Sequence, residues 1–409
     1  MTAMDTLHEE GAPDPRLDLN SIALGLLEES LNALMDEQAS ELGAIRNGYR
    51  ERKLTTCIGT LTLKIPKLRE GTYFPDDLVR RWSRTDTALV SAVCDMWAAG
   101  VSTRKVEKVM ANMGVESMSR SRVSRLCGGL DAEVSELRRC DLSWQEWPYL
   151  WLDATYVPCR EAGAARSTAI VSAVAAGMDG TRRVVALECV DCESYQSWRG
   201  FLLGLRERGI EGVRLVISDA HSGLVRAIRE VFAGAAWQRC IAHLERNVMD
   251  RCRRKGDGAA AVAALKAAFA ETDPALVRAG YSCAVGLLAE VDGPGAELLE
   301  QARPYALNYL AFPAEHRLWI RTNNIQERMN AEIKRRTKVV QVFPSVASLE
   351  RLVGAVCCDQ NDAWASSRNF IDRRTLAEDY EREEKGDGSS EIPRVLMTVR
   401  EAFNRKRAA

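Results

Sequence analysis

The pattern of hydrophobic and polar residues changes character several times along the chain. Between residues 19 and 42, apolar residues recur at helical spacing, which predicts an amphipathic helix with an acidic polar face. Two alternating segments follow, residues 53–58 and 60–65, and they predict a β-hairpin that is joined near Gly59 and ends at Pro66. Upstream, the Asn47-Gly48 pair predicts a turn. From residue 85 to residue 137 the pattern is helical again.

Within this helical region, residues 101–126 have the pattern of two short helices with a turn between them. We expect Gly114 to end the first helix and Ser119 to cap the second. If Val123 and Leu126 pack inward, the second helix presents its polar face to the major groove of DNA or to its phosphates, as in a helix-turn-helix. A plain helical hairpin would have the same pattern. The side chains expected to contact DNA are Arg120, Ser121, Arg122, Ser124 and Arg125.

After Trp144 the pattern becomes that of an α/β domain. Three strands are expected, residues 149–157, 167–177 and 182–190, and Met178-Asp-Gly180 predicts a hairpin turn between the last two. A helix capped by Ser194, a strand at 213–217, a helix at 222–232 and a strand at 236–241 should follow. The order β-β-β-α-β-α-β is that of the ribonuclease H-like fold, a mixed sheet with helices on both faces.

The segment from residue 243 to 319 is helical and rich in alanine, with expected breaks at 256–258, 273–274, 292–295 and Pro304. We interpret it as a helical insertion, because it separates Asp219 from Glu327 by far more residues than a simple connection requires. The expected domains are an acidic helical region (1–43), a basic β-hairpin (44–75), a helix-turn-helix-like DNA-binding region (76–142) and an α/β domain (143–409) with the insertion at about 244–319.

Composition indicates an ordinary soluble protein of 409 residues, 46% hydrophobic and 28% charged. Its apolar runs are far shorter than the about 18 residues of a membrane-spanning helix, and the acidic start lacks the order of a signal peptide. Twelve cysteines are scattered without the dense framework of a secreted domain, so we expect reduced thiols and no disulfides. We therefore expect a cytoplasmic protein that makes no contact with membranes.

The net charge of −1 hides a strong segregation of charge. Residues 1–43 are acidic, whereas residues 44–69, 80–125 and 320–340 are each predominantly basic. A solvated surface explains any single basic block, but three blocks in a neutral protein favour contact with a polyanion such as DNA. In the hairpin, the side chains expected on DNA phosphates are Arg46, Arg50, Arg52 and Lys53.

Three carboxylates stand where a metal-dependent nuclease would need them. Asp153 interrupts an apolar strand, Asp219 closes another, and Glu327 opens a basic helical run. A buried unpaired carboxylate costs several kcal/mol, so each needs a partner or a cation. Two Mg²⁺ or Mn²⁺ ions about 3.5–4 Å apart would suit these hard oxygen ligands. Alternatively, Asp219 caps the next helix and Asn324-x-x-Glu327 forms a variant capping box, whereas mid-strand Asp153 has no comparable local role.

The spacing Cys240-x-x-His243 admits two interpretations. With Cys189 and Cys192 it would complete a Cys₃His zinc site. The interpretation that we favour gives Cys240 and His243 a supporting role, in which they pack or hydrogen-bond behind the three carboxylates or contact DNA there. His221, two residues after Asp219, could touch a phosphate or be an ordinary turn histidine.

Several segments resemble bacterial Mutator-type transposases, and the resemblance covers most of the chain. The segments around the carboxylates are Leu152-Asp-Ala-Thr-Tyr, Ile217-Ser-Asp-Ala-His-Ser-Gly-Leu, Trp237-Gln-Arg-Cys-Ile-Ala-His and Asn324-Ile-Gln-Glu-Arg-Met-Asn-Ala-Glu-Ile-Lys-Arg-Arg-Thr. Further segments are Arg46-Asn-Gly-Tyr-Arg-Glu-Arg, Gly100-Val-Ser-Thr-Arg-Lys-Val, Phe343-Pro-Ser and Gln360-Asn-Asp-Ala-Trp. The resemblance implies an insertion-sequence enzyme with an Asp-Asp-Glu active site in a ribonuclease H-like core.

By this resemblance, Asp153, Asp219 and Glu327 bind two Mg²⁺ or Mn²⁺ ions and catalyse DNA cleavage and strand transfer. The implied partners are the element's terminal inverted repeats and target DNA, which places the protein at the nucleoid. A homodimer or a larger synaptic complex is also implied. The basic helix after Glu327 should contact the DNA backbone, which fixes register without reading sequence. Its side chains expected at the DNA are Arg328, Lys334, Arg335 and Arg336.

Two alternatives remain open at the level of sequence. A DNA-binding regulator with an inactive nuclease core would use the helix-turn-helix alone. Another ribonuclease H-like nuclease, acting on RNA or in repair, would explain the three carboxylates but not the DNA-binding regions that precede them.

Overall fold

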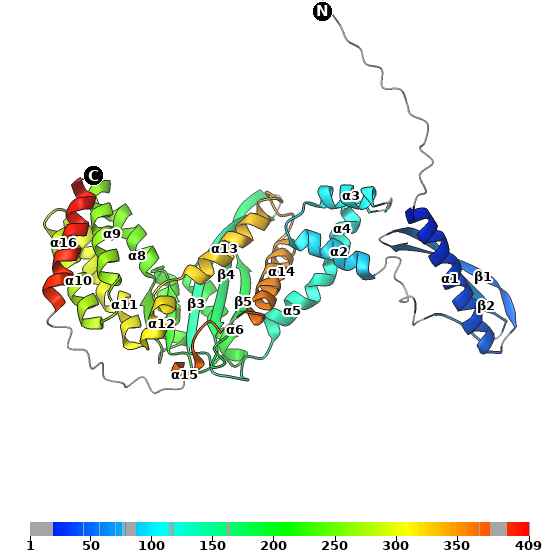
Figure 1. Cartoon of the computed structure of the whole chain (residues 1–409), viewed down its shortest axis with the longest axis horizontal. Helices are drawn as coiled ribbons and strands as arrows, with labels where there is room; N and C mark the ends of the chain where they lie inside the picture. Colours follow the sequence, from blue (N-terminus) through cyan, green and yellow to red (C-terminus); the bar gives the residue numbers. More distant parts are fainter. Residues whose placement is uncertain are drawn as a thin grey trace, which may run out of the picture. The chain divides into compact units, whose positions relative to one another are not determined.

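Figure 1 shows the chain in a computed structural model. The structure describes residues 19–43, 45–56, 58–69, 71–75, 78, 87–113, 115, 118–161, 164–367, 369–376 and 391–408. The chain divides into two compact units, Met1–Gly129 and Leu130–Ala409. Among the described residues, no helix combines the length and the apolar character needed to cross a membrane.

The first unit contains the predicted amphipathic helix and β-hairpin. Helix α1 (Leu19–Glu41) packs on β2 (Gly59–Leu68), which pairs antiparallel with β1 (Arg46–Thr56). The buried side chains that join them are Met35, Leu61, Leu63 and Ile65. Both strands are longer than predicted, and the turn predicted at Asn47-Gly48 is wrong. Gly48 lies inside β1 with φ +84°, where a bulge shifts the register between Arg46 and Tyr49.

The same unit contains α2 (Thr87–Ala98) and the two helices of the predicted helix-turn-helix, α3 (Thr103–Asn112) and α4 (Arg120–Leu126). A 3-10 turn, η1 (Cys127–Leu130), follows. Ser119 caps α4 as predicted, because its hydroxyl accepts the Arg122 N–H at 3.3 Å. Val123 is fully buried and Leu126 partly buried, so the predicted inward face is confirmed. Gly114 lies outside the described residues.

The second unit is built on a five-stranded mixed sheet with the order β5-β4-β3-β6-β7. β4 (Ala164–Ala176) runs antiparallel to both of its neighbours, β3 (Tyr149–Glu161) and β5 (Arg182–Val190). β6 (Leu215–Ser218) and β7 (Ala236–Arg239) run parallel to β3. The predicted strands and their order along the chain are confirmed, as is the turn at 178–180, where Gly180 has φ +75°.

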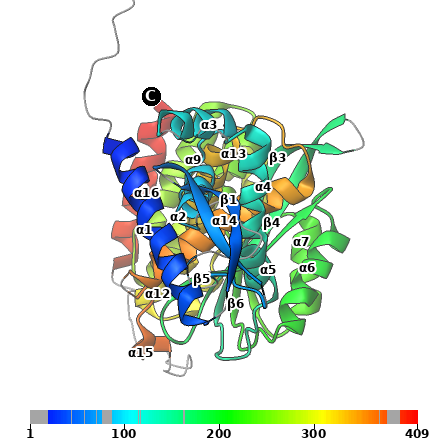
Figure 2. The same cartoon turned by 90° about the vertical axis from the view of Figure 1, so that its right-hand side faces the viewer.

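Helices cover both faces of this sheet, in agreement with the continuous burial of β6 and of most of β4. α6 (Tyr195–Glu207) and α7 (Ser222–Val231) lie together on one face of the sheet (Figure 2). There they pack against Leu150 and Leu152 of β3. α13 (Asn324–Thr337) and α14 (Val346–Ala365) contact the sheet as well, and α13 meets the side chain of Asp153. Because successive side chains of a strand point to opposite faces, Asp153 belongs to the α13 side.

Two shorter helices complete this arrangement. α5 (Asp131–Arg139) packs on α14 and β5 within the second unit, although the sequence analysis grouped residues up to 142 with the DNA-binding region. α15 (Arg373–Leu376) follows α14. Thr375 of α15 is joined through His316 to Tyr149 of β3, with hydrogen bonds of 2.7 and 2.8 Å.

The predicted helical insertion is confirmed between β7 and α13. It comprises α8 (Ile241–Arg251), α9 (Lys255–Phe269), α10 (Pro274–Ala289), α11 (Gly293–Ala306), η2 (Asn308–Ala311) and α12 (Ala314–Ile320). The C-terminal α16 (Ile392–Ala408) packs on α9 and α10. Asp273 and Asp292 cap α10 and α11 at predicted breaks.

The breaks predicted at 256–258 and at Pro304 are wrong, because both lie inside helices, α9 and α11. Gly258 has a packing role instead. A Cβ atom at this position would lie 3.0 Å from the Cα of Met249, so the glycine permits the close approach of α9 to α8.

Candidate active site

The sheet register brings two of the three candidate carboxylates to neighbouring positions. β3 and β6 pair in parallel with Trp151 opposite Ile217. Asp153 lies two residues further along β3, and Asp219 directly follows the last residue of β6, so continuation of the same register places them side by side. Glu327 lies in the first turn of α13, which packs on β3. The three carboxylates thus come from the central strand β3, from the end of its neighbour β6 and from α13, which packs on β3.

The charges of these carboxylates act on one another. The pKa of Asp153 is raised to about 7, first by burial and then by the charge of Asp219, with smaller contributions from Glu327 and Glu193. A backbone hydrogen bond at Ala154 opposes the shift. Burial and like charges both disfavour an ionised carboxylate, so a cation at this position would relieve the repulsion.

A row of buried amide side chains fixes α13 on β3. Asn323 donates to the Leu152 carbonyl at 3.0 Å, and Gln326 donates to the Trp151 carbonyl at 2.8 Å and the Ser172 carbonyl at 3.2 Å. Asn330 donates to Asp153 Oδ2 at 2.7 Å. The spacing i, i+3, i+7 puts the three amides on one helix face. The sequence analysis missed them, although polar amides at this spacing in a charged helix were a usable signal.

Glu327 is not part of a capping box. The N-cap of α13 is Asn323, whose side chain makes no capping hydrogen bond, and Asn324 is already inside the helix. Instead, Glu327 Oε1 forms an ion pair with Arg246 and lies 4.0 Å from His243 Nε2. Both partners are on α8. The interpretation of Glu327 as a cap is therefore wrong, and its partners are tertiary.

His243 and Cys240 lie behind the carboxylates at the start of α8. Burial lowers the pKa of His243, and the charge of Arg246 lowers it further. The Cys240 sulfur is fully buried and accepts the Asn323 N–H at 3.1 Å. Burial raises the pKa of the Cys240 thiol to about 11, so the thiol is neutral at pH 7. Cys240 thereby links the beginnings of α8 and α13.

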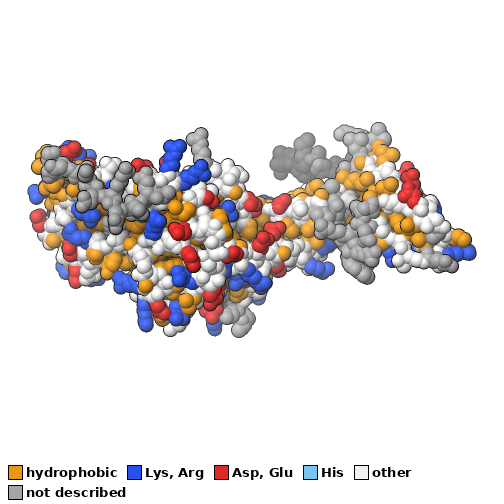
Figure 3. All heavy atoms as spheres, turned by 90° about the horizontal axis from the view of Figure 1, so that it is seen from below, with side chains coloured by type: hydrophobic (Ala, Val, Ile, Leu, Met, Phe, Trp, Pro, Cys, Tyr) orange, Lys and Arg blue, Asp and Glu red, His pale blue; other side chains and the backbone are white. Residues whose placement is uncertain are grey.

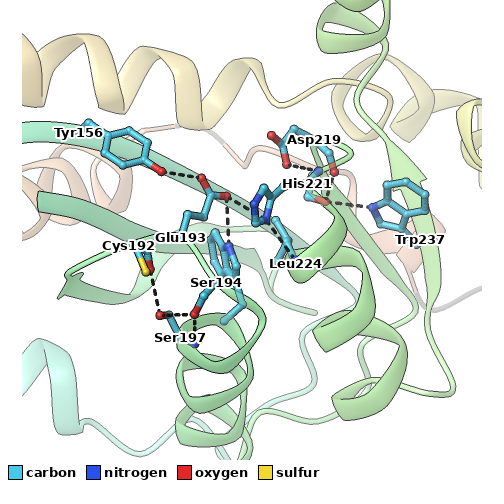
Figure 4. Close-up of polar contacts among 11 residues, drawn as sticks. Tyr156, Cys192, Glu193, Ser194, Ser197, Asp219, His221, Leu224 and Trp237 are labelled. Atoms are coloured by element: carbon cyan, nitrogen blue, oxygen red, sulfur yellow. Dashed lines mark hydrogen bonds and ion pairs between the residues drawn. The ribbon is translucent and has the colours of Figure 1, made fainter. Parts of the chain in front are cut away.

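Asp219 does not cap the helix that follows it, so that interpretation is wrong. The N-cap of α7 is His221, whose Nδ1 accepts the Leu224 N–H at 3.4 Å. Asp219 Oδ1 accepts the His221 N–H at 3.1 Å, which ties the carboxylate to the turn (Figure 4). Trp237 donates to Ser218 Oγ at 2.9 Å directly before Asp219.

A fourth carboxylate, which the sequence analysis missed, lies beside this turn. Glu193 accepts hydrogen bonds from Tyr156 and from Trp198, each at 3.1 Å, and its Oε1 lies 3.7 Å from His221 Nδ1 (Figure 4). Glu193 directly precedes Ser194, the N-cap of α6, and no motif in the sequence marks it as a site residue.

An open hollow of about 520 Å³ lies next to Asp219. Its lining combines cationic, amide and carboxylate side chains from the ends of β6 and β7 and from α8 and α11. The lining residues are Asp219, Ala220, His221, Arg239, His243, Asn247, Asp250, Arg251 and Leu298.

The family model described as "Transposase, Mutator family" matches residues 18–367. The chain belongs to the Mutator family of transposases. It is 37% identical over 340 residues, 83% of this chain and 82% of the relative, to the transposase for insertion sequence element IS1081 of Mycobacterium tuberculosis. It is 34% identical to the transposase for insertion sequence element IS256 in transposon Tn4001 of Staphylococcus aureus, over 86% of this chain and 93% of the relative.

Among solved structures, this Mutator-family chain is similar to the Drosophila P element transposase strand transfer complex. The TM-score is 0.27 and the identity 11%, over 83% of this chain and 94% of that chain, which is too weak to support an argument about fold. The named relatives are transposases of insertion sequences, so transposase function is supported for the chain.

The three carboxylates of this Mutator-family site suit a divalent cation chemically, because carboxylate oxygens are hard ligands. Asp153 also lies among other negative charges, which a cation would neutralise. In the described part of the chain, however, no three His, Cys, Asp or Glu side chains converge closely enough to hold a metal ion. This applies to the three carboxylates, since Glu327 is paired with Arg246. It applies equally to Cys189, Cys192, Cys240 and His243, so the zinc set is not assembled.

The arginines and lysines predicted to contact DNA differ in their surroundings. Some already have carboxylate partners within the protein: Arg46 with Asp36, Arg120 with Glu107, Arg335 with Glu332, and Arg336 with Glu332 and Asp359. Others are exposed: Arg50, Lys53, Arg125, Arg328 and Lys334. Arg52 stacks on the Phe74 ring at 5.2 Å, and Arg122 is partly buried. On the face drawn in Figure 3, basic and acidic side chains are interspersed over the second unit.

Proposed function

We propose that the chain is the transposase of an insertion sequence and that Asp153, Asp219 and Glu327 form its active site. The observation that carries this proposal is the coupling of three carboxylates from β3, β6 and α13, in a chain of the Mutator family. A ribonuclease H-like core is part of the proposal. The sheet order β5-β4-β3-β6-β7, antiparallel on one side of β3 and parallel on the other, supports it.

The proposed reaction is direct phosphodiester attack in two steps. Water attacks the phosphorus at the element's end and the 3′-oxygen leaves; the freed 3′-hydroxyl then attacks a phosphodiester of target DNA, with no covalent protein intermediate. Asp153, Asp219 and Glu327 would hold two Mg²⁺ or Mn²⁺ ions, which when bound activate the attacking oxygen and stabilise the leaving one. Asn330 orients Asp153, and the His221 N–H orients Asp219.

Recognition of the terminal inverted repeats is assigned in this proposal to the first unit. Its hairpin exposes Arg50 and Lys53, and α4 exposes Arg125 on a helix whose opposite side is buried. Phosphate contacts by the hairpin would set register, and α4 would read base edges. The protein would act at the nucleoid as a homodimer or larger complex that pairs two DNA ends. Part of α1 suits such a contact, because Ile22, Leu26 and Leu34 are exposed on it.

The test is a cleavage assay on labelled duplexes that carry the element's end and flanking DNA, with Mg²⁺ or Mn²⁺. The native chain should nick at the end, and Asp219→Asn should abolish nicking while it retains DNA binding. Asp362→Asn is a matched control, because this exposed aspartate of α14 loses the same charge away from the site. Binding without cleavage by the native chain, under conditions that permit end pairing, would instead indicate a DNA-binding regulator.

A further inference from the structure

Arg239, the last residue of β7, is a cation without a carboxylate partner at the edge of the site. It pairs in register with Ser218, which directly precedes Asp219. Within the described part of the chain its guanidinium forms no ion pair. Its Nη2 donates to Asn247 Oδ1 at 3.1 Å, and its Nε is buried without any hydrogen-bond partner.

Burial lowers the pKa of Arg239, which reflects the cost of removing the guanidinium from water, and the nearby charge of Asp219 acts in the opposite direction. An anion bound in contact with the guanidinium would offset the remaining cost. By contrast, the charge of Arg246 on α8 is balanced by a carboxylate, because Arg246 forms an ion pair with Glu327. The buried Nε of Arg239 cannot itself reach an outside anion, but the Arg239 side chain lines the hollow and forms no ion pair with a described residue, so its charge is available to an anion bound there.

The hollow next to Arg239 has suitable size and donors. Its volume of about 520 Å³ falls within the range of ligand pockets, about 300–1,000 Å³. Arg251 and His243 line it together with Arg239, and His243 Nδ1 is a second buried atom without a hydrogen-bond partner. Asp219 and Asp250 also line the hollow and repel anions. The anion must therefore sit on the Arg239 side, directly next to a proposed catalytic carboxylate.

We propose that Arg239 binds a backbone phosphate of the DNA strand next to the bond that is cut, and that Asn247 orients its guanidinium for this contact. The planar guanidinium matches the geometry of a phosphate and cannot lose its charge. The DNA identity of the phosphate rests on the proposed function. Arg239 would thereby position the strand so that the scissile phosphodiester meets Asp219.

The test measures binding of the full-length native chain and Arg239→Gln to the element's end duplex, without divalent metal. In a second set of duplexes, a neutral methylphosphonate replaces one phosphate at a time around the cleavage site. We expect Arg239→Gln to weaken binding about tenfold and to reduce the slope of log affinity against log salt by about one. One methylphosphonate should weaken native binding by a similar factor and should not weaken Arg239→Gln further.

Two control variants separate phosphate binding from a structural role or a general charge effect. Arg278→Gln, an exposed arginine of α10 outside the hollow, removes the same charge and should leave the methylphosphonate effect intact. Arg239→Lys keeps the charge and should restore part of the affinity. Thermal unfolding of each variant shows whether it is folded; if Arg239→Gln is not, the comparison of Arg239→Lys with the native chain on the same duplexes decides.

Three outcomes would overturn the assignment. The first is that folded Arg239→Gln binds DNA with unchanged affinity. The second is that every methylphosphonate weakens binding by Arg239→Gln as much as it weakens binding by the native chain. The third is a loss of inorganic phosphate binding with DNA binding intact, which would assign the hollow to a free phosphate. These are binding results, so they are independent of the loss of cleavage in Asp219→Asn that tests the proposed function. Absence of any DNA binding by the native chain would overturn both.

Discussion

Arg246 of α8 and Glu327 of α13 form an ion pair although 81 positions separate them in the sequence. The pair joins the helical insertion to the helix that carries the third proposed catalytic carboxylate. The guanidinium neutralises Glu327 at the place where the proposed mechanism requires a metal ion. A metal ion that binds Glu327 must therefore compete with Arg246. Through this arginine, the helical insertion influences the charge of the proposed site.

Removal of this competing cation should strengthen metal binding. We expect Arg246→Gln to bind Mn²⁺ more tightly than the native chain, by up to about fivefold, which corresponds to about 1 kcal/mol for a partly exposed ion pair. Isothermal titration of the full chain with Mn²⁺ measures this directly. Arg278→Gln should leave the Mn²⁺ affinity unchanged, and an Arg246→Gln affinity equal to the native one would show that the pair does not compete with metal.

Asn330 should be needed for cleavage and not for DNA binding. Its amide donates to Asp153 Oδ2 at 2.7 Å, and a hydrogen bond to a charged group contributes about 1.5–3 kcal/mol. Asn330→Ala should therefore slow single-turnover cleavage roughly tenfold or more. Affinity for the end duplex should stay within about twofold of the native value. Equal losses of cleavage and affinity would argue that Asn330 acts only through the fold.

The buried His316 should make stability fall in mild acid. Burial lowers the pKa of His316, whose ring nitrogens bond to Tyr149 and Thr375, so the unfolded chain takes up a proton at higher pH than the folded one. Its contribution to stability is present above the usual histidine pKa of about 6.5 and is lost as the pH falls below that value, by at most about 1.4 kcal/mol per pH unit.

Thermal unfolding midpoints between pH 8 and pH 5, compared for the native chain and His316→Gln, test this. The native midpoint should fall more steeply with decreasing pH than that of the variant. Parallel curves for the two proteins would show that the fall comes from other groups, such as His243, whose pKa is also lowered by burial.

The helix-turn-helix assignment depends on α4. Arg122→Ala and Arg125→Ala should each weaken binding to terminal-repeat DNA, by about 1–3 kcal/mol where the side chain reads a base. Titration by fluorescence anisotropy against repeat and scrambled duplexes separates loss of sequence preference from uniform weakening. Unchanged binding by both variants would remove the assignment and leave α3 and α4 as a plain helical hairpin.

Much of the fold was accessible from local patterns. The change of pattern after Trp144 and a hairpin turn predicted the three antiparallel strands, and Ser119 and Ser194 marked helix starts that the structure confirms. Local patterns failed where packing decides: Gly48 forms a bulge, and Gly258 sits inside a helix so that α8 can approach. A glycine is compatible with a turn, a bulge or a close contact, and only its neighbours in space determine which.

For the site, the sequence by itself determined the family to which the chain belongs and predicted the carboxylates Asp153, Asp219 and Glu327 as the residues that carry chemistry. Only the tertiary structure decided their partners. The β3–β6 register, the amides of α13 on β3, and Arg246 on Glu327 join residues dozens to well over a hundred positions apart. Such contacts depend on how strands pair and helices pack, and no local pattern of residue types specifies that geometry.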